Sequence, residues 1–179
     1  MLPPERLSRF LSYLLRHRPT EYPLVFDRHG FVAWADVVEL IQERYYDATE
    51  EEVRAVVNRP EKKRFELRDD KVRATYGHSF PVDLGLEPVE PPEELYYGTA
   101  RDLAQSILRD GLKPRDRRYV HLSASLEEAE AVGKRRDPAP AIIVVDTRAA
   151  RQANVTFYLS GPLYLAENVP PQFLSLKQL

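Results

Sequence analysis

The apolar pattern near the N-terminus predicts the first helix of the chain. Five apolar residues recur at the spacing that gathers side chains on one face of an α-helix: Leu7, Phe10, Leu11, Leu14 and Leu15. Pro19 cannot continue a helix, so we expect the helix to end just before it. The helical repeat places Arg16 opposite the leucines, where packing would leave it free, and places His17 nearer the apolar edge.

The pattern of residues 34–75 predicts two more helices and a hairpin. Apolar residues at helical spacing predict a helix over 34–45, and Thr49 with Glu52 forms a capping box that opens the next helix. Two alternating runs, 64–68 and 71–75, flank a pair of aspartates and predict a β-hairpin. Three helices followed by a hairpin is the element order of a winged helix, a helix-turn-helix variant that binds nucleic acid or docks proteins.

The composition changes over residues 80–94, where prolines alternate with acidic residues in a way that is typical of an extended linker. We therefore predict an N-terminal lobe over 1–80, a linker over 81–94 and a C-terminal lobe over 95–179. The pattern of the C-terminal lobe is mixed α/β, so the predicted fold class of the whole chain is α+β.

Short apolar-rich segments predict the strands of the C-terminal lobe. They lie at residues 95–97, 119–122, 141–145, 155–159 and 163–166. The continuous apolar run 141–145 is the best candidate for a central strand that is covered on both faces. Two helices are expected as well, capped by Thr99 with Asp102 and by Ser125 with Glu128, and ended by Gly111 and Gly133.

The composition of the chain limits the classes of function. Hydrophobic residues make up 43% of the 179 residues and charged residues 30%, which is typical of a globular protein. The net charge of −2 gives no sign of a polyanion partner, so nucleic-acid binding must depend on local patches. The sequence contains no cysteine and no apolar stretch long enough for a membrane span, and we expect a cytoplasmic monomer. It contains no glycine-rich nucleotide loop and no paired-histidine spacing, so we expect no metal.

Four basic clusters stand out against this neutral average, at residues 16–18, 62–64, 115–118 and 134–136. Arginines that converge on one point can clamp phosphate oxygens, and a histidine beside them can transfer a proton near neutral pH. The alternative is that each cluster is an exposed helix end or turn, as cations in the last turn of a helix usually are. That alternative is favoured for 134–136, and the residues alone leave the other three clusters undecided.

Six motifs resemble those of one enzyme family. They lie at residues 7–19 (LSRFLSYLLRHRP), 63–65 (KRF), 72–79 (VRATYGHS), 96–99 (YYGT), 111–123 and 163–174. Each motif is weak alone, but six in this order are specific, and they run nearly from end to end. The chain is therefore similar to the NAD-dependent RNA 2′-phosphotransferases, the family of the tRNA-splicing 2′-phosphotransferase.

This resemblance implies a winged-helix lobe that binds RNA and an ADP-ribosyltransferase-like α/β lobe that binds NAD. It implies a reaction in two steps, in which an internal RNA 2′-phosphate displaces nicotinamide from NAD and a ribose hydroxyl then displaces the RNA 2′-oxygen from phosphorus. The products are RNA with a 2′-hydroxyl, nicotinamide and a cyclic phosphate of ADP-ribose, so NAD is consumed as a co-substrate.

The resemblance also assigns residues to roles. The catalytic set falls on Arg16, His17, Arg64 and Arg117, with the arginines stabilising phosphate charge and His17 moving a proton. The NAD-binding positions fall on Tyr97, Gly98, Thr99, His121, Leu122 and Ser123. Arg18, Lys62 and Lys63 are candidates for RNA contacts, with exposed surface charge as an equal alternative.

The sequence departs from the family pattern at three tyrosines. Tyr97 and Tyr119 stand where the family has histidine, and Tyr76 stands where it has glutamine. Tyrosine keeps a ring with a hydrogen-bonding tip at the two histidine positions, so we expect altered binding there and no loss of activity.

Other residues and other functions remain open from the sequence. Trp34 is assigned to the core and His29 to a turn, whereas His78 is placed either at the NAD site or at the junction of the lobes. Two rival functions are an ADP-ribosyltransferase that caps terminal nucleic-acid phosphates and a non-catalytic winged-helix sensor of a nucleotide.

Overall fold

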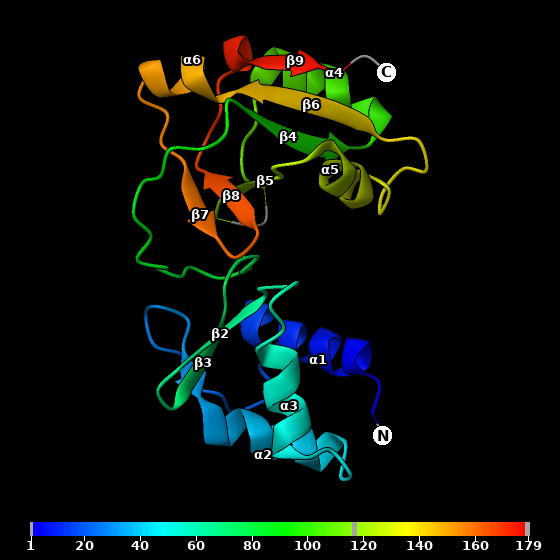
Figure 1. Ribbon diagram of the computed structural model, residues 1–179, viewed down its shortest axis with the longest axis vertical. Coiled ribbons are helices and arrows are strands. Elements are labelled where there is room, and N and C mark those ends of the chain that lie inside the picture. Colours follow the sequence, from blue (N-terminus) through cyan, green and yellow to red (C-terminus); the bar gives the residue numbers. More distant parts are fainter. Residues whose placement is uncertain (1, 116–117, 178–179) are drawn as a thin grey trace. The chain divides into compact units, whose positions relative to one another are not determined.

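A computed structural model of the chain describes residues 2–115 and 118–177, which fall into two units (Figure 1). The first unit spans Met1–Gly85 and the second spans Leu86–Leu179. The division lies within the stretch 81–94 that the sequence assigns to a linker. Val82 and Leu84, near the start of that stretch, are buried in the first unit.

The first unit consists of three helices and a small antiparallel sheet. Its elements are α1 (Pro4–His17), β1 (Val32–Ala33), α2 (Trp34–Arg44), α3 (Glu50–Val57), β2 (Phe65–Arg68) and β3 (Lys71–Ala74). The strand order is β1-β3-β2, and the hairpin of β2 and β3 turns at Asp69 and Asp70. The predicted helices and hairpin are therefore confirmed.

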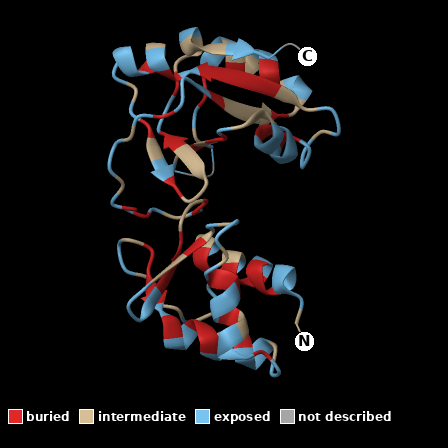
Figure 2. Cartoon of the chain, viewed as in Figure 1, coloured by how far each residue is buried: buried red, intermediate tan, exposed pale blue. Residues whose placement is uncertain are grey.

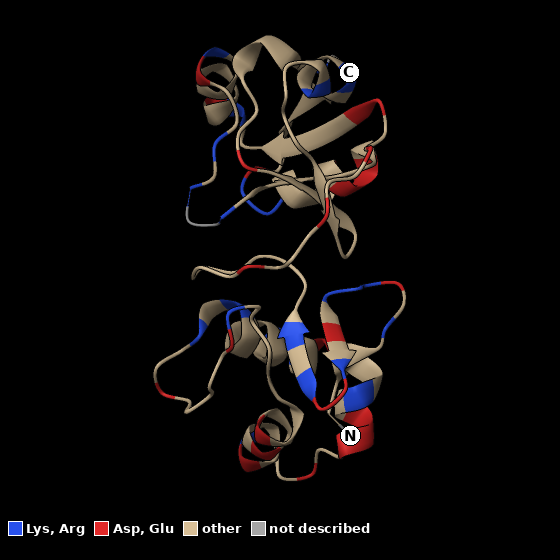
Figure 3. Ribbon diagram, turned by 90° about the vertical axis from the view of Figure 1, so that its left-hand side faces the viewer, with Lys and Arg blue, Asp and Glu red and all other residues tan. Residues whose placement is uncertain are grey.

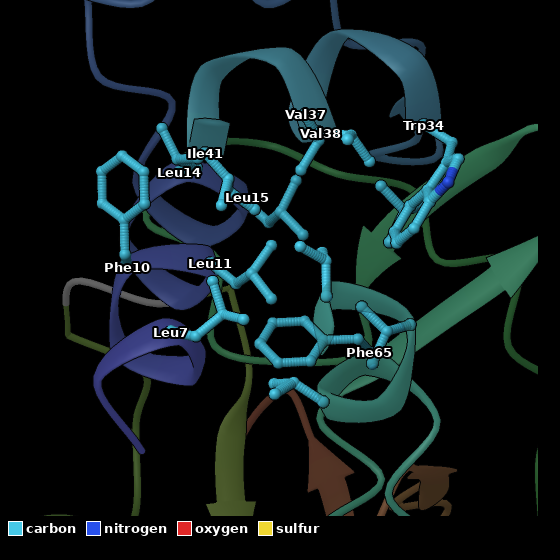
Figure 4. Packing of buried hydrophobic residues seen from close by; sticks show 14 of the residues in the cluster. Leu7, Phe10, Leu11, Leu14, Leu15, Trp34, Val37, Val38, Ile41 and Phe65 are labelled. Carbon is cyan, nitrogen blue, oxygen red and sulfur yellow. The ribbon is translucent and has the colours of Figure 1, made fainter. Parts of the chain in front are cut away.

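The apolar stripe of α1 forms the centre of the first unit's core. All five of its predicted residues are buried, and Leu11, Leu14 and Leu15 are 0% exposed. They pack against Trp34, Val37 and Ile41 of α2 and against Phe65 of β2 (Figure 4). Burial of each such side chain contributes about 1.5–3 kcal/mol, so the stripe fixes one side of α1 firmly and leaves its other side for polar contacts.

Over residues 86–115 and 118–177, the second unit has two antiparallel sheets and three short helices. Its elements are β4 (Glu94–Thr99), α4 (Arg101–Asp110), β5 (Val120–Leu122), α5 (Leu126–Gly133), β6 (Ala141–Asp146), α6 (Thr147–Gln152), β7 (Tyr158–Ser160), β8 (Leu163–Ala166), the 3₁₀ turn η1 (Pro171–Phe173) and β9 (Leu174–Leu176). One sheet has the order β4-β6-β9 and the other has the order β5-β8-β7. The chain is therefore an α+β protein, as predicted.

Strand β6 is the central strand of its sheet, as its apolar run predicts, and most of it is buried (Figure 2). On one face, Ile143 and Val145 pack with Ala104 and Ile107 of α4. On the other face lie Ile142 and Val144, and α5 packs there against β4 and β6. Both faces are covered because every side chain from Ile142 to Val145 is apolar.

Four details of the second unit differ from the sequence prediction, and the first is helix α6, which was not predicted. Thr99 does not cap α4, because it is the last residue of β4, paired with Ala141 and only 3% exposed. Its predicted role belongs to Asp137, whose carboxylate accepts from the Arg101 N–H at 3.0 Å. The strand predicted over 155–159 begins at Tyr158. Strand β9 was not predicted, because it is short and closely follows two prolines.

The local caps and turns that the sequence predicts elsewhere are confirmed. Thr49 and Glu52 form the capping box of α3. Ser125 caps α5 by accepting from the Glu128 N–H, and Gly111 ends α4 with φ 93°. Over residues 2–115 and 118–177, no helix is both long enough and apolar enough to cross a membrane.

Candidate functional site

The C-terminal end of α1 carries two of the predicted catalytic residues, Arg16 and His17, in its last turn. The helix ends there because Arg18 adopts a left-handed backbone conformation, with φ 46° and ψ 57°, before Pro19. Cations in a last turn are stabilised by the helix dipole. Positive charge at the end of α1 is therefore expected on structural grounds alone. The contacts of each side chain must show whether it is also part of a functional site.

Ser79 closes this helix end from far along the chain. Its backbone N–H donates to the Arg16 carbonyl at 2.9 Å, and its hydroxyl donates to the same oxygen at 3.2 Å. The hydroxyl oxygen also lies 2.9 Å from Nδ1 of His17. The last carbonyls of a helix lack partners within the helix, so Ser79 acts as a C-terminal cap and fixes the His17 ring at the same time.

Arg16 is covered by the segment that leads to Ser79. Its guanidinium lies 4.6 Å from the centre of the Tyr76 ring, a cation–π distance, and its Nε and Nη2 atoms are buried. A Cβ at Gly77, where φ is 84°, would lie 3.2 Å from Cδ of Arg16. The prediction that Arg16 is left free was therefore wrong: it points away from the leucine stripe but is held by Tyr76 and Gly77.

Arg64 approaches α1 from the start of the hairpin. Its Nη1 donates to Oγ of Ser8, a residue of α1 that is only 2% exposed, at 3.2 Å. Its carbonyl accepts from the N–H of Thr75, the residue before Tyr76. The segment 75–79 therefore contacts all three residues: Thr75 binds the backbone of Arg64, Tyr76 faces the guanidinium of Arg16 and Ser79 binds the ring of His17.

The three predicted RNA-contacting residues follow His17 or precede Arg64 in the sequence. Arg18 is exposed, and its guanidinium lies 5.9 Å from the Phe26 ring and 5.8 Å from the Phe80 ring. Lys62 is half-buried, whereas Lys63 is exposed with φ 48° and accepts from the Thr75 hydroxyl through its carbonyl. The loop before β2 carries mainly Lys and Arg (Figure 3). Contact with RNA remains a prediction for all three.

The predicted NAD-binding residues of β4 have clear packing roles. A Cβ at Gly98 would lie 1.9 Å from the Ala129 carbonyl oxygen, so α5 approaches β4 closely only because this residue is glycine. Thr99 is 3% exposed, and Tyr97 is half-buried against the core of the second unit. Gly98 and Thr99 are therefore explained by packing, whether or not a ligand binds nearby.

The predicted residues of β5 lie next to β4. The backbones of Ser123 and Tyr96 exchange two hydrogen bonds of 2.8 and 2.9 Å, which join the two sheets at this point. Leu122 is 0% exposed and belongs to the core, so its side chain cannot face a ligand. His121 is half-buried, and it presents a polar ring close to the bridge. The structure thus brings the β4 and β5 residues together.

Arg117, the fourth predicted catalytic residue, lies outside the described residues. Beside it, the Nε of Arg118 donates to the hydroxyl of Tyr119 at 3.3 Å. The Tyr119 ring lies 5.9 Å from the Tyr158 ring, so this tyrosine at a family histidine position packs on β7.

Comparison with known proteins identifies the family. The RNA 2′-phosphotransferase, Tpt1 / KptA family, matches residues 3–165. The chain is 43% identical over 175 residues to a protein of Agrobacterium fabrum named "probable RNA 2′-phosphotransferase", covering 94% of this chain and 92% of that protein. Proteins with the same name from Bacillus thuringiensis and Thermococcus kodakarensis are each 39% identical, over 96% of this chain and over 95% and 96% of their own lengths.

The chain belongs to the RNA 2′-phosphotransferase family.

Of three further residues of this family member, Trp34 and His29 behave as the sequence suggests, and the place of His78 at the NAD site or at the junction of the lobes stays a prediction. Trp34 is 7% exposed and donates to Glu50 at 2.8 Å, so it is a core residue. His29 contacts the Asp83 carbonyl through Nδ1 at 2.6 Å, which is a structural contact. His78 is 6% exposed and meets Phe80 edge-on within the first unit.

The sequence did not predict that Tyr76 and Ser79 contact the predicted catalytic residues, or that Asp137 caps α4. Tyr76 and Ser79 reach Arg16 and His17 across about 60 residues of chain, and no local pattern reports such a contact. Asp137 accepts from the Arg101 backbone, the Arg101 side chain and the Ala139 backbone, which lowers its pKa from 3.8 to about 2. It lies at the N-terminus of α4 and lines a surface depression together with residues 100–103 and Arg136. Among the residues that the structure describes, no group of three or more acidic or histidine side chains could hold a metal ion.

Proposed function

We propose that this chain transfers an internal RNA 2′-phosphate to NAD, by ADP-ribosylation of the phosphate followed by transesterification. The products are RNA with a 2′-hydroxyl, nicotinamide and an ADP-ribose cyclic phosphate. The observation that carries the proposal is the family match over residues 3–165, which reaches into both units. The relatives named above bear the name of this activity and match at least 94% of the chain.

The proposal gives each unit a role. The first unit is a winged-helix lobe that binds RNA, which its order of three helices and a hairpin supports. The second unit is an ADP-ribosyltransferase-like lobe that binds NAD, which its two small antiparallel sheets, joined between Tyr96 and Ser123, support. Arg18, Lys62 and Lys63 contact the RNA backbone in this proposal, because they adjoin His17 and Arg64 in the sequence.

The residues of β4 and β5 fit a nucleotide in part. Tyr97 and His121 offer two half-buried rings with polar tips from neighbouring strands, which suits stacking and hydrogen bonding. Gly98, Thr99, Leu122 and Ser123 contribute the backbone and the shape of the site, because their side chains are absent or buried. NAD supplies an anomeric carbon with a cationic leaving group, and the proposed chemistry uses no metal.

The arginines act on the phosphate. Arg16, Arg64 and Arg117 hold the phosphate in line with its target, and this orientation is the main requirement of the first step because the nucleophile is already an anion. No catalytic carboxylate is needed to activate this phosphate nucleophile. In the second step, the same guanidiniums stabilise the charge that develops on the phosphoryl group. The contacts of Arg16 with Tyr76 and of Arg64 with Ser8 support such fixed positions.

His17 moves the proton in the second step. An attacking hydroxyl must lose a proton and the departing RNA 2′-oxygen must gain one, and an imidazole can do both near neutral pH. The hydrogen bond between His17 and Ser79 supports this role because it fixes the ring at the end of α1.

One assay tests the proposed function. The purified chain is mixed with NAD and an oligoribonucleotide that carries a single internal 2′-phosphate, and the strand, nicotinamide and the ADP-ribose product are resolved. A dephosphorylated strand with an ADP-ribose cyclic phosphate supports the proposal. A stable ADP-ribosylated strand supports phosphate capping, and unchanged NAD supports a sensor; either result contradicts the proposal. Arg135→Ala, at an exposed position just after α5, is the control for alanine substitutions of the proposed catalytic arginines and should keep full activity.

A further inference from the structure

The Ser79 hydroxyl touches two groups with different hydrogen-bonding capacities. One is the Arg16 carbonyl oxygen at 3.2 Å, which can only accept. The other is Nδ1 of His17 at 2.9 Å, which accepts or donates according to where the imidazole proton lies. A hydroxyl carries one proton, so it can donate to only one of these two partners.

Only one proton arrangement satisfies both contacts. If Ser79 donated to Nδ1, its oxygen would face the Arg16 carbonyl oxygen at 3.2 Å with no proton between them. If Ser79 donates to the Arg16 carbonyl, its lone pairs are left to accept a proton from Nδ1 of His17. The second arrangement makes two hydrogen bonds and the first makes one bond and one repulsive contact.

We infer that Ser79 is a positioning residue that holds neutral His17 in the tautomer with its proton on Nδ1. The lone pair of the ring is then on Nε2. The direction of these two hydrogen bonds, from His17 to Ser79 and from Ser79 to Arg16, is fixed because the Arg16 carbonyl can accept a hydrogen bond but cannot donate one. Ser79 orients and sets the tautomer of His17 without a charged group, a role that a carboxylate has in other histidine-containing sites.

The inference deepens the proposed function and rests on it for its chemical meaning. In the second step, Nε2 takes the proton of the hydroxyl that attacks phosphorus while the new P–O bond forms. The same nitrogen returns that proton to the RNA 2′-oxygen as its P–O bond breaks, so no net proton is consumed. Nδ1–H donates to Ser79 throughout, in both the neutral and the charged ring.

The tautomer can be measured without any substrate. Nitrogen–proton correlation spectra of the full chain, recorded where the imidazoles are neutral, report which ring nitrogen carries the proton, and His17→Gln assigns the His17 signals among the four histidines. We expect the proton on Nδ1 in the wild-type chain. A proton on Nε2 overturns the inference, whatever the activity of the protein.

Substitution of Ser79 tests the consequence. Ser79→Ala keeps the backbone N–H that binds the Arg16 carbonyl, so it removes both hydrogen bonds of the hydroxyl and leaves the helix cap. We expect the proton of neutral His17 to move toward Nε2 and the second step to slow by about 10- to 100-fold, less than after loss of the histidine itself. Ser79→Thr keeps the hydroxyl at an exposed position and is expected to restore both readouts.

The controls separate the inference from the proposed function. Ser175→Ala, at an exposed serine of β9, should leave the His17 spectrum and the rates unchanged. If the wild-type chain fails to act on NAD and 2′-phosphorylated RNA, the proposed function is wrong, and the wild-type spectrum still decides the tautomer. If the chain is active and Ser79→Ala changes neither the spectrum nor the second step, Ser79 is only a helix cap and the inference is wrong.

Discussion

The predicted site residues of the two units differ in what holds them in place. In the first unit, Arg16, His17 and Arg64 lie outside the apolar core and are fixed by aromatic and polar contacts. Along β4 and β5, Gly98 and Leu122 are required by the packing of α5 and of the core. The packing of the apolar core does not explain the charged groups of the residues of the first kind, so we interpret them as functional.

This difference changes how substitutions in the two regions are interpreted. A loss of activity after a change in β4 or β5 is ambiguous, because the same change disturbs the fold. A loss of activity at the end of α1 is informative if stability is preserved. The following predictions test this contrast.

The largest effect is expected from His17→Ala. Loss of the proton-transferring imidazole should slow complete 2′-phosphate transfer by about 10²- to 10⁴-fold. The melting temperature should change little, because His17 is exposed and its partner Ser79 keeps its backbone bond to Arg16. Steady-state assays with a 2′-phosphorylated oligonucleotide and thermal unfolding measure the two quantities. A variant that unfolds early would assign His17 to the fold.

The converse is expected of Gly98→Ala, which should destabilise the second unit by about 3 kcal/mol or more. A Cβ placed 1.9 Å from the Ala129 carbonyl forces α5 away from β4, because backbone atoms cannot yield as a flexible side chain does. Urea denaturation measures the loss. Gly85→Ala is the control: its φ is 65° and no atom lies within 4 Å, so it carries only the backbone cost of about 1–2 kcal/mol. Equal stability of the two variants would contradict the packing role of Gly98.

A smaller effect is expected from Tyr76→Ala. It removes the ring that faces the Arg16 guanidinium, a contact worth about 0.5–2 kcal/mol, and should lower kcat/KM for the RNA by about 2- to 30-fold. Tyr76→Phe keeps the ring face and should retain nearly full activity. If both variants lose activity equally, the hydroxyl of Tyr76 matters and the stacking interpretation is wrong.

The smallest effect concerns acid stability and involves neither predicted site. The pKa of Asp137 is lowered to about 2 by hydrogen bonds from Arg101 and Ala139. The stabilisation is complete above its ordinary pKa of 3.8 and is lost as the pH falls from about 4 toward 2. Asp137→Asn should therefore be less stable than the wild-type chain at neutral pH. The difference between their free energies of unfolding should shrink below pH 4. A constant difference across this range, in urea denaturation midpoints, would contradict the assignment.

The sequence predicts those parts of the molecule that depend on neighbours along the chain. The leucine stripe of α1, the capping box of Thr49 and Glu52 and the hairpin of β2 and β3 are all local patterns, and the structure has them as predicted. The prediction that Thr99 caps α4 failed because Thr99 pairs with Ala141 in the sheet. Asp137, which is 36 residues from Arg101, caps the helix instead. Local spacing cannot reveal a partner at that distance.

The candidate site shows the same limit. The basic last turn of α1 is visible in the sequence, and the family resemblance adds Arg64. The sequence does not show what covers that turn, because Tyr76 and Ser79 lie after the hairpin, about 60 residues along the chain. The prediction of a free Arg16 failed for this reason: the helical repeat gives the direction of a side chain but not what packs on it.

Single-turnover kinetics of His17→Ala and Arg64→Ala test the central claim most directly. Nicotinamide release reports the first step, and the mobility of a labelled 2′-phosphorylated strand reports the second. If His17 and Arg64 act on the phosphoryl group in the second step, both variants slow the second step more than nicotinamide release and accumulate an ADP-ribosylated strand. If either folded variant loses nicotinamide release and no such strand forms, the assignment of its residue to the second step is contradicted.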